Sequence, residues 1–359
     1  MPSLDGLRAI AILAAMLAHL NGTMSFPVIP PHLSAVYARI TSLGVRAFFV
    51  LSGFLITTLL KDEAARTGDI SLRWFYFRRT LRIFPACYAY LIVLAIARAA
   101  GLISMDGADF FAAATYTTNY HHDRSWWAGH TWSLAVEEQF YLLWPFAMKL
   151  LAPRRARALT IAVIVASPLV RVLLYRFAPA FRQGIGETFP TVADTLAAGC
   201  LLALSTDELG RSRRYLAFLS SPAFWLAPLA ILVSAAIPSE GLRLLVGETV
   251  MNISLAMVID RFVRFPETPV GRLLNTRVFV AVGSVSYSLY LWQQPFLNRH
   301  STAAFTRFPL NVALAVVMAL LSYHLVEQPM LRLRGRLERR WRERRARIDD
   351  VGTRVLPAK

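Results

Sequence analysis

Two ionisable residues interrupt an otherwise apolar stretch near the N-terminus. The segment "LRAIAILAAMLAHL", Leu7 to Leu20, is almost wholly apolar except for Arg8 and His19. In an α-helix, residues eleven apart share one face and are separated by about 16 Å of rise. An ionisable group at membrane depth costs about 3 kcal/mol or more unless it faces protein or water. The pair therefore predicts a functional site inside a helix bundle.

A second polar group opens an apolar helix further along the chain. The segment "HTWSLAVEEQFYLLWP" carries His130, Ser133, Glu137 and Glu138. Adjacent carboxylates lie about 100° apart on a helix, so we expect one glutamate to face the bundle interior and the other a neighbour or the interface. A histidine on one helix and a glutamate on another are the parts of an acid/base pair. A structural hydrogen-bond network is the alternative.

Three arginines lie at the start of a third apolar stretch. In "FYFRRTLRIFP", Arg79 and Arg82 are three residues apart and share a helix face, with Arg78 beside them. Guanidinium forks match phosphate oxygens well, which favours an anion site. The general excess of basic residues on the cytoplasmic side of membrane proteins explains the same arginines without a ligand.

The connection "TTNYHHDRSWWAGH" carries His121, His122, Asp123, Trp126 and Trp127. Consecutive residues rarely coordinate one ion together, so we predict no metal site. Tryptophans at the edge of a span are usually interfacial anchors, and their other use is to stack on sugar rings.

Four further residues fall within or at the end of apolar stretches. Asp194 and Glu327 are expected to stabilise the bundle as partners of arginines. Cys87 and Cys200 are expected to be small buried hydrophobic residues.

The elements that carry these residues are predicted to be membrane-spanning helices. The chain has 359 residues, of which 56% are hydrophobic, and a mean hydropathy of +0.46. This composition predicts an all-α polytopic membrane bundle of about ten helices, each near the roughly 20 residues that a bilayer requires. No small-residue cleavage site follows Leu20, which disfavours a signal peptide. The predicted spans are 7–21, 43–60, 82–99, 133–151, 158–176, 190–205, 222–237, 242–260, 278–297 and 309–326.

The distribution of charge predicts the topology. The net charge is +17, but the basic residues gather in alternate connections, which points to membrane orientation and away from nucleic acid. Both termini are therefore predicted to be cytoplasmic. The tail, 332–359, is predicted to be either a basic helix on anionic lipid headgroups or a solvated extension. The connections predicted to face outward are 22–42, 101–131, 177–189 and 298–308.

Taken together, these segments resemble the acyltransferase-3 family of polytopic membrane acyltransferases. "LDGLRAIAILAAMLAHL", "FFVLSGFLIT", "FYFRRTLRIFP" and "HTWSLAVEEQFYLLWP" resemble family motifs in the same order, and "SVSYSLYLWQQPF" and "YHLVEQPM" resemble its last two spans. The resemblance covers roughly residues 3–331, which we take as a single transmembrane domain, 1–331. Val192 and Ala193 stand before Asp194 where family members often carry an arginine, so Asp194 lacks that neighbour.

The resemblance implies an O-acyltransferase of the bacterial cytoplasmic (inner) membrane. The donor would be acetyl-CoA or another acyl-CoA, used as a co-substrate with no permanently bound cofactor. The acceptor would be a hydroxyl of an envelope polysaccharide, glycolipid or lipid-linked sugar. The resemblance implies catalytic roles for Arg8, His19, Glu137 and Glu138, and it makes Arg79 and Arg82 the paired arginines of the family. We expect these two arginines and Arg78 to bind the donor. The residues expected to bind substrate are Ser52, His130, Trp132 and Ser133.

Two mechanisms and two other function classes remain open at this point. His19, oriented by Glu137 or Glu138, would act as general base, or would take the acyl group first. A proton-coupled transporter also uses intramembrane His, Arg and Glu, but such proteins often show two similar halves and this chain does not. A non-catalytic partner in an envelope assembly is the third class.

Overall fold

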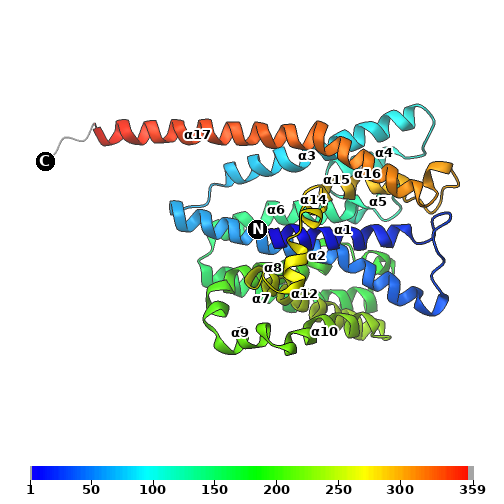
Figure 1. Ribbon diagram of the computed structural model, residues 1–359, viewed down its shortest axis with the longest axis horizontal. Coiled ribbons are helices and arrows are strands. Elements are labelled where there is room, and N and C mark those ends of the chain that lie inside the picture. The colour runs from blue at the N-terminus through cyan, green and yellow to red at the C-terminus, as the bar shows by residue number, and fades with distance from the viewer. Residues whose placement is uncertain (1, 355–359) are drawn as a thin grey trace.

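Helices account for the regular structure of the chain. The computed structural model describes residues 2–354, which contain helices and no strand, so the all-α prediction is confirmed. The longer helices run roughly parallel in one bundle (Figure 1). Those of eight or more residues are α1 (Pro2–Leu20), α2 (Pro31–Thr67), α3 (Leu72–Ala99), α4 (Gly107–Ala114), α6 (Thr131–Leu150), α7 (Pro153–Phe177), α8 (Phe189–Arg211), α9 (Arg213–Ser220), α10 (Leu226–Ala236), α12 (Glu248–Arg264), α14 (Arg277–Ser284), α15 (Ser286–Phe296), α16 (Leu310–Ser322) and α17 (Gln328–Arg354).

The number of apolar helices differs from the ten predicted. Within residues 2–354, seven helices are long and apolar enough to cross a membrane, or eight if the pair around α9 and α10, bent by 75°, counts as one span. Two predicted spans are not among them. The span 133–151 corresponds to α6, which carries two glutamates and a lysine. The span 278–297 is divided into α14 and α15, of 8 and 11 residues, each too short to cross a bilayer alone.

Glycines bring the central helices α2 and α8 into close contact. A Cβ atom on Gly53 of α2 would overlap the backbone of Leu196, and one on Gly199 of α8 would overlap the backbone of Val50. Small residues of this kind let membrane helices approach backbone to backbone. The contact fixes the segment of α2 that carries Ser52, the residue before Gly53.

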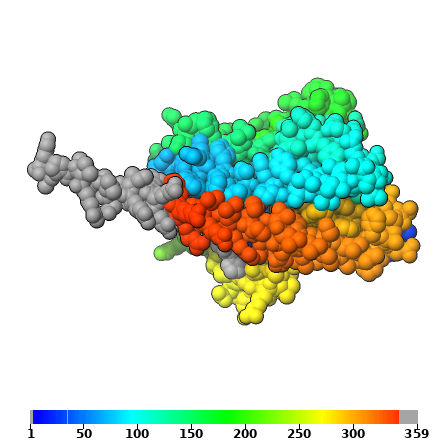
Figure 2. Space-filling model, turned by 90° about the horizontal axis from the view of Figure 1, so that it is seen from above, coloured from blue at the N-terminus to red at the C-terminus, as the bar shows by residue number. Residues whose placement is uncertain are grey.

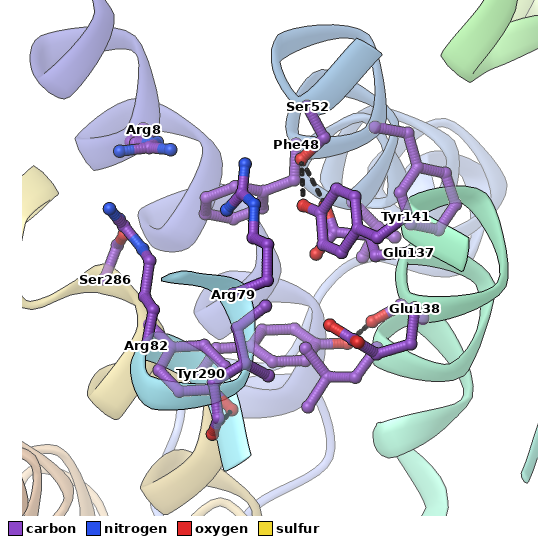
Figure 3. Close-up of a pocket in the computed structure, with 16 residues that line it drawn as sticks. Arg8, Phe48, Ser52, Arg79, Arg82, Glu137, Glu138, Tyr141, Ser286 and Tyr290 are labelled. Atoms are coloured by element: carbon purple, nitrogen blue, oxygen red, sulfur yellow. Dashed lines mark hydrogen bonds between the residues drawn. The ribbon is translucent and has the colours of Figure 1, made fainter. Parts of the chain in front are cut away.

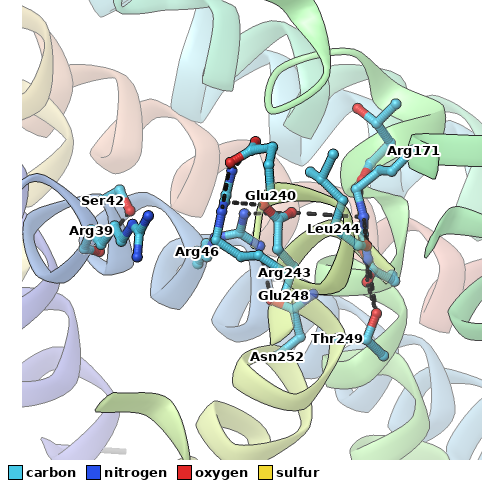
Figure 4. Close-up of polar contacts among 12 residues, drawn as sticks. Arg39, Ser42, Arg46, Arg171, Glu240, Arg243, Leu244, Glu248, Thr249 and Asn252 are labelled. Atoms are coloured by element: carbon cyan, nitrogen blue, oxygen red, sulfur yellow. Dashed lines mark hydrogen bonds and ion pairs between the residues drawn. The ribbon is translucent and has the colours of Figure 1, made fainter. Parts of the chain in front are cut away.

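A buried ionic network holds a second group of helices together. Arg171 of α7 donates to both carboxylate oxygens of Asp194 in α8, at 2.9 and 3.0 Å, and both side chains are fully buried. Glu248 of α12 pairs with Arg46 of α2 at 2.8 Å and with Arg243 at 2.7 Å (Figure 4). The prediction that Asp194 stabilises the bundle through an arginine is confirmed, and the arginine comes from α7.

The other buried acid has a different partner from the one predicted. Glu327 is 3% exposed and accepts a 3.0 Å hydrogen bond from Ser288 Oγ. Among the described residues it forms no ion pair, so the predicted arginine partner is wrong. Cys87 and Cys200 are buried free thiols, as predicted.

The C-terminal segment forms one long helix against the bundle. Helix α17 packs on α3, with ring centroids of Trp74 and Trp341 4.5 Å apart, and both figures show it running along α3 (Figures 1 and 2). The predicted domain boundary at residue 331 falls inside this continuous helix. The end of the predicted basic tail, residues 355–359, lies outside the described residues.

Candidate functional site

A cavity of about 80 Å³ lies between α1, α2, α3, α6 and α15. It is wide enough for several water molecules or a small chemical group. Several residues singled out from the sequence line it together (Figure 3). The polar lining residues are Arg8, Ser52, Arg79, Arg82, Ser133, Glu137, Glu138, Tyr141, Ser286, Tyr287 and Tyr290.

Three arginines give the cavity a positive wall. Arg8 comes from α1, and Arg79 and Arg82 come from successive turns of α3 (Figure 3). The Arg79 guanidinium lies 4.5 Å from the ring centroid of Tyr141, within the range of a cation–π contact. Arg8 is 3.6 Å from Asp5, and Arg79 and Arg82 form no ion pair with any described residue. These guanidinium groups are available to an anionic ligand.

Both glutamates of α6 line this cavity. Glu137 Oε1 accepts a 2.5 Å hydrogen bond from Ser52 Oγ, and the Tyr141 hydroxyl donates to the same serine at 3.1 Å. Glu138 Oε1 is buried without a hydrogen-bond partner in the described chain. Both glutamates therefore line one cavity, which differs from the expectation that the second faces a neighbouring helix or the interface.

His19 lies elsewhere, near the C-terminal end of α1. Its ring meets the Trp126 ring edge-on at a centroid distance of 5.7 Å and lies beside the Gln293 carboxamide. Eleven residues of helix separate it from Arg8 by about 16 Å, and it does not line the cavity. In the part of the chain that the structure describes, neither glutamate bonds to His19, so the predicted carboxylate–imidazole pair is not formed.

The surroundings of His19 contain buried polar atoms without partners. Both ring nitrogens of His130, both polar atoms of the Gln293 side chain and His19 Nδ1 make no hydrogen bond to described residues. Such atoms in a native interior usually contact water or a ligand. His130 and Gln293 are 3% and 0% exposed. The surroundings of His19 are therefore a buried polar region, to which α1, α15 and His130, the residue before α6, contribute.

Ser133 and Tyr290 connect the cavity to the buried polar region around His130. Both residues line the cavity, and their hydroxyl oxygens are 2.6 Å apart. The Tyr290 hydroxyl also donates to the His130 carbonyl at 2.9 Å. The arginine-lined cavity thus borders the region of His19 through two hydroxyl groups.

Two other predicted site residues have different surroundings. Arg78 does not line this cavity and pairs with Glu63 at 2.8 Å. Trp132 packs against Phe49, with ring centroids 6.0 Å apart, and does not line the cavity.

The outer connection is held by hydrogen bonds. Asp109 contacts His121 at 3.2 Å and accepts from the backbone nitrogens of Ser125 and Asp106. Asp106, Asp109 and His121 bring ligand atoms within 4.8 Å of one another, but these bonds already engage Asp109. Trp126 packs inward, because its ring meets His19 and its indole nitrogen donates to the Gln294 carbonyl at 2.9 Å.

Several residues of the site were not singled out from the sequence. Tyr141 and Tyr290 line the cavity, and Gln293 contacts His19. These residues lie in "EEQFYLLWP" and "SVSYSLYLWQQPF", which belong to segments that resemble family motifs. The resemblance gives no role to the individual residues. Whether such a residue lines the cavity depends on the direction of its side chain, which the sequence does not show.

Comparison with known proteins identifies the family of the chain. A family model described as an acyltransferase domain matches residues 1–325. The chain belongs to the acyltransferase-3 family. The family match covers every residue of the cavity, and no solved structure matches this acyltransferase-3 chain.

Curated relatives of this acyltransferase-3 chain carry names of one activity. It is 28% identical over 371 residues to the O-acetyltransferase OatA of Staphylococcus aureus. This match covers 92% of this chain and 57% of OatA. It is 28% identical over 364 residues to the provisionally named peptidoglycan O-acetyltransferase YrhL of Bacillus subtilis, covering 92% of this chain and 54% of the relative. The chain thus spans little more than half the length of these relatives.

Proposed function

We propose that this protein transfers an acyl group, acetyl in the first instance, from cytoplasmic acyl-CoA to a hydroxyl of an envelope polysaccharide, glycolipid or lipid-linked sugar. The observation that carries the proposal is the cavity in which Arg8, Arg79 and Arg82 face Glu137. Its free guanidinium groups suit a polyanionic donor. The names of OatA and YrhL support acetyl as the group and peptidoglycan as one acceptor to test.

The chemistry assigned to the site is proton transfer at His19. The imidazole accepts the proton of the acceptor hydroxyl, whose oxygen attacks the thioester carbonyl and forms an ester as the CoA thiolate leaves. A second route has His19 take the acyl group and pass it to the acceptor. Since the arginines and His19 lie near opposite ends of α1, the thioester arm would extend past Ser133 and Tyr290.

This function is proposed for a protein of the bacterial inner membrane. Basic residues are concentrated in the connections after α2, α6, α8 and α12. This supports a cytoplasmic position for the C-terminal ends of these four helices. The predicted cytoplasmic N-terminus would place the arginine cavity, which lies near the start of α1, toward the cytoplasm. His19 would then lie toward the outer face, where an envelope acceptor arrives.

The test is transfer of labelled acetyl groups in cells. Envelopes of cells that make wild-type protein, His19→Ala or the exposed control His324→Ala are incubated with radioactive acetyl-CoA at matched expression. Label in a polysaccharide or lipid fraction with wild type and His324→Ala, and not with His19→Ala, supports the enzyme. Equal labelling in all three contradicts the role of His19. No labelling with any variant favours another donor or a transporter.

A further inference from the structure

A second cavity adjoins the first at Arg79 and Arg82. It has a volume of about 440 Å³ and lies between the C-terminal half of α2, the N-terminal half of α3 and helix α17. Arg79 and Arg82 line both cavities. The two cavities are therefore neighbours, the smaller beside the glutamates of α6 and the larger beside α17.

Helix α17 supplies a side chain to the wide cavity. Arg334 lines it together with Glu338 and lies near Arg78 and Arg82 of α3. The nearest carboxylate oxygen, on Glu338, is 3.8 Å from Arg334 Nε, too far for a hydrogen bond. Arg334 Nε is buried and makes no hydrogen bond within the described residues. A donor group thus faces the cavity unused.

The wall of the wide cavity has more positive than negative charge. Its charged residues are Arg66, Arg78, Arg79, Arg82 and Arg334 against Asp62, Glu63 and Glu338. Arg78 is neutralised by Glu63 at 2.8 Å. The excess of positive charge comes from Arg79, Arg82 and Arg334, which line the same cavity, and guanidinium groups bind phosphate well.

We propose that α17 forms one wall of the donor site and that Arg334 binds a phosphate group of the coenzyme A moiety. This inference rests on the proposed function. The narrow cavity, of about 80 Å³, suits the thioester end of the donor, and the wide one suits its phosphates. A helix that served only to contact lipid headgroups would direct Arg334 outward, whereas Arg334 lines the cavity with its Nε buried. The donor site thus extends beyond residues 1–325, where the family match ends.

The test is binding of coenzyme A to the purified full-length protein in a neutral detergent, measured by titration calorimetry. Arg334→Ala is expected to raise the Kd about tenfold or more, the effect of losing a charge-assisted hydrogen bond. Glu338→Gln removes the neighbouring negative charge and is expected to lower the Kd about threefold. Arg336→Ala, an equal charge change at an exposed position of the same helix, is expected to change it less than about twofold.

Each contrary result has a distinct meaning. If wild type binds coenzyme A and Arg334→Ala binds it equally well, the inference is overturned while the proposed function stands. If Arg334→Ala affects only binding to vesicles containing phosphatidylglycerol, the ligand is a lipid phosphate and the inference is likewise overturned. If wild type does not bind coenzyme A, both fail. Misfolding cannot raise the affinity for coenzyme A in Glu338→Gln. This variant therefore tests the inference even if Arg334→Ala is unstable.

Discussion

Ser52 Oγ donates a 2.5 Å hydrogen bond to Glu137 Oε1, which joins α2 to α6 across the cavity. The Tyr141 hydroxyl donates to the same serine oxygen, so Ser52 holds the tyrosine and the carboxylate together. Gly53 sets the position of Ser52 by close contact with Leu196. The glutamate is thereby held facing the cavity that also holds Arg79.

Substitution Ser52→Ala removes this connection. A carboxylate that loses a hydrogen bond in a partly buried site reorients or changes its protonation, so we expect acetyl transfer to fall about tenfold or more. Ser42→Ala is the matched control, because Ser42 is an exposed serine of the same helix that bonds only to the Arg39 carbonyl. Transfer of labelled acetyl groups in membrane vesicles measures the activity of both variants. Equal loss in the two variants would show that α2 as a whole is sensitive.

Arg79 is expected to act through the shape of its side chain as well as its charge. The guanidinium stacks on Tyr141 and faces both cavities, so Arg79→Lys keeps the charge but loses the planar fork. We expect the KM for acetyl-CoA to rise about tenfold. Arg73→Lys, at an exposed position of α3, serves as the control. An unchanged KM in Arg79→Lys would mean that the donor needs only a positive charge there.

Part of the site could be predicted from the sequence because its residues lie in local patterns. Arg79 and Arg82 are three residues apart on one helix, and Ser133 and Glu137 are four apart, so helix geometry alone places each pair on one face. Their convergence with Arg8 in a cavity follows from the packing of α1, α3 and α6. The sequence does not give that packing, and it predicts Arg8 in one site with His19.

The partners of His19 could not be predicted in this way. Trp126 and Gln293 come from segments far from His19 in the chain, and their contact depends on how α14 and α15 divide one apolar stretch. A hydropathy pattern does not show such a break. The same limit explains Asp194, whose partner Arg171 comes from another helix.

The pair Arg171–Asp194 is expected to stabilise the fold. Removing one partner leaves an uncompensated buried charge, which costs about 3–5 kcal/mol. Arg171→Ala should therefore lower the apparent Tm in detergent by about 10 °C. Arg157→Ala breaks a pair of similar length whose carboxylate, Glu208, is 62% exposed, and should cost less than about 1 kcal/mol. Equal shifts in Tm would contradict the structural role assigned to the buried pair.

Gln293 is expected to position His19. Its carboxamide is fully buried, has no hydrogen-bond partner among other described residues and lies beside the imidazole, so it is suited to fix the orientation of the ring. Gln293→Ala should lower kcat about tenfold and leave the KM for acetyl-CoA unchanged, because the arginines lie near the other end of α1.

The control for Gln293→Ala is Gln183→Ala, an exposed glutamine in the connection between α7 and α8. Rates at increasing acetyl-CoA separate kcat from KM in each variant. A purely structural role for Gln293 would reduce the amount of folded protein and leave the rate per folded molecule unchanged. A fall in kcat per folded molecule at constant KM, absent from Gln183→Ala, would place Gln293 beside the reacting histidine.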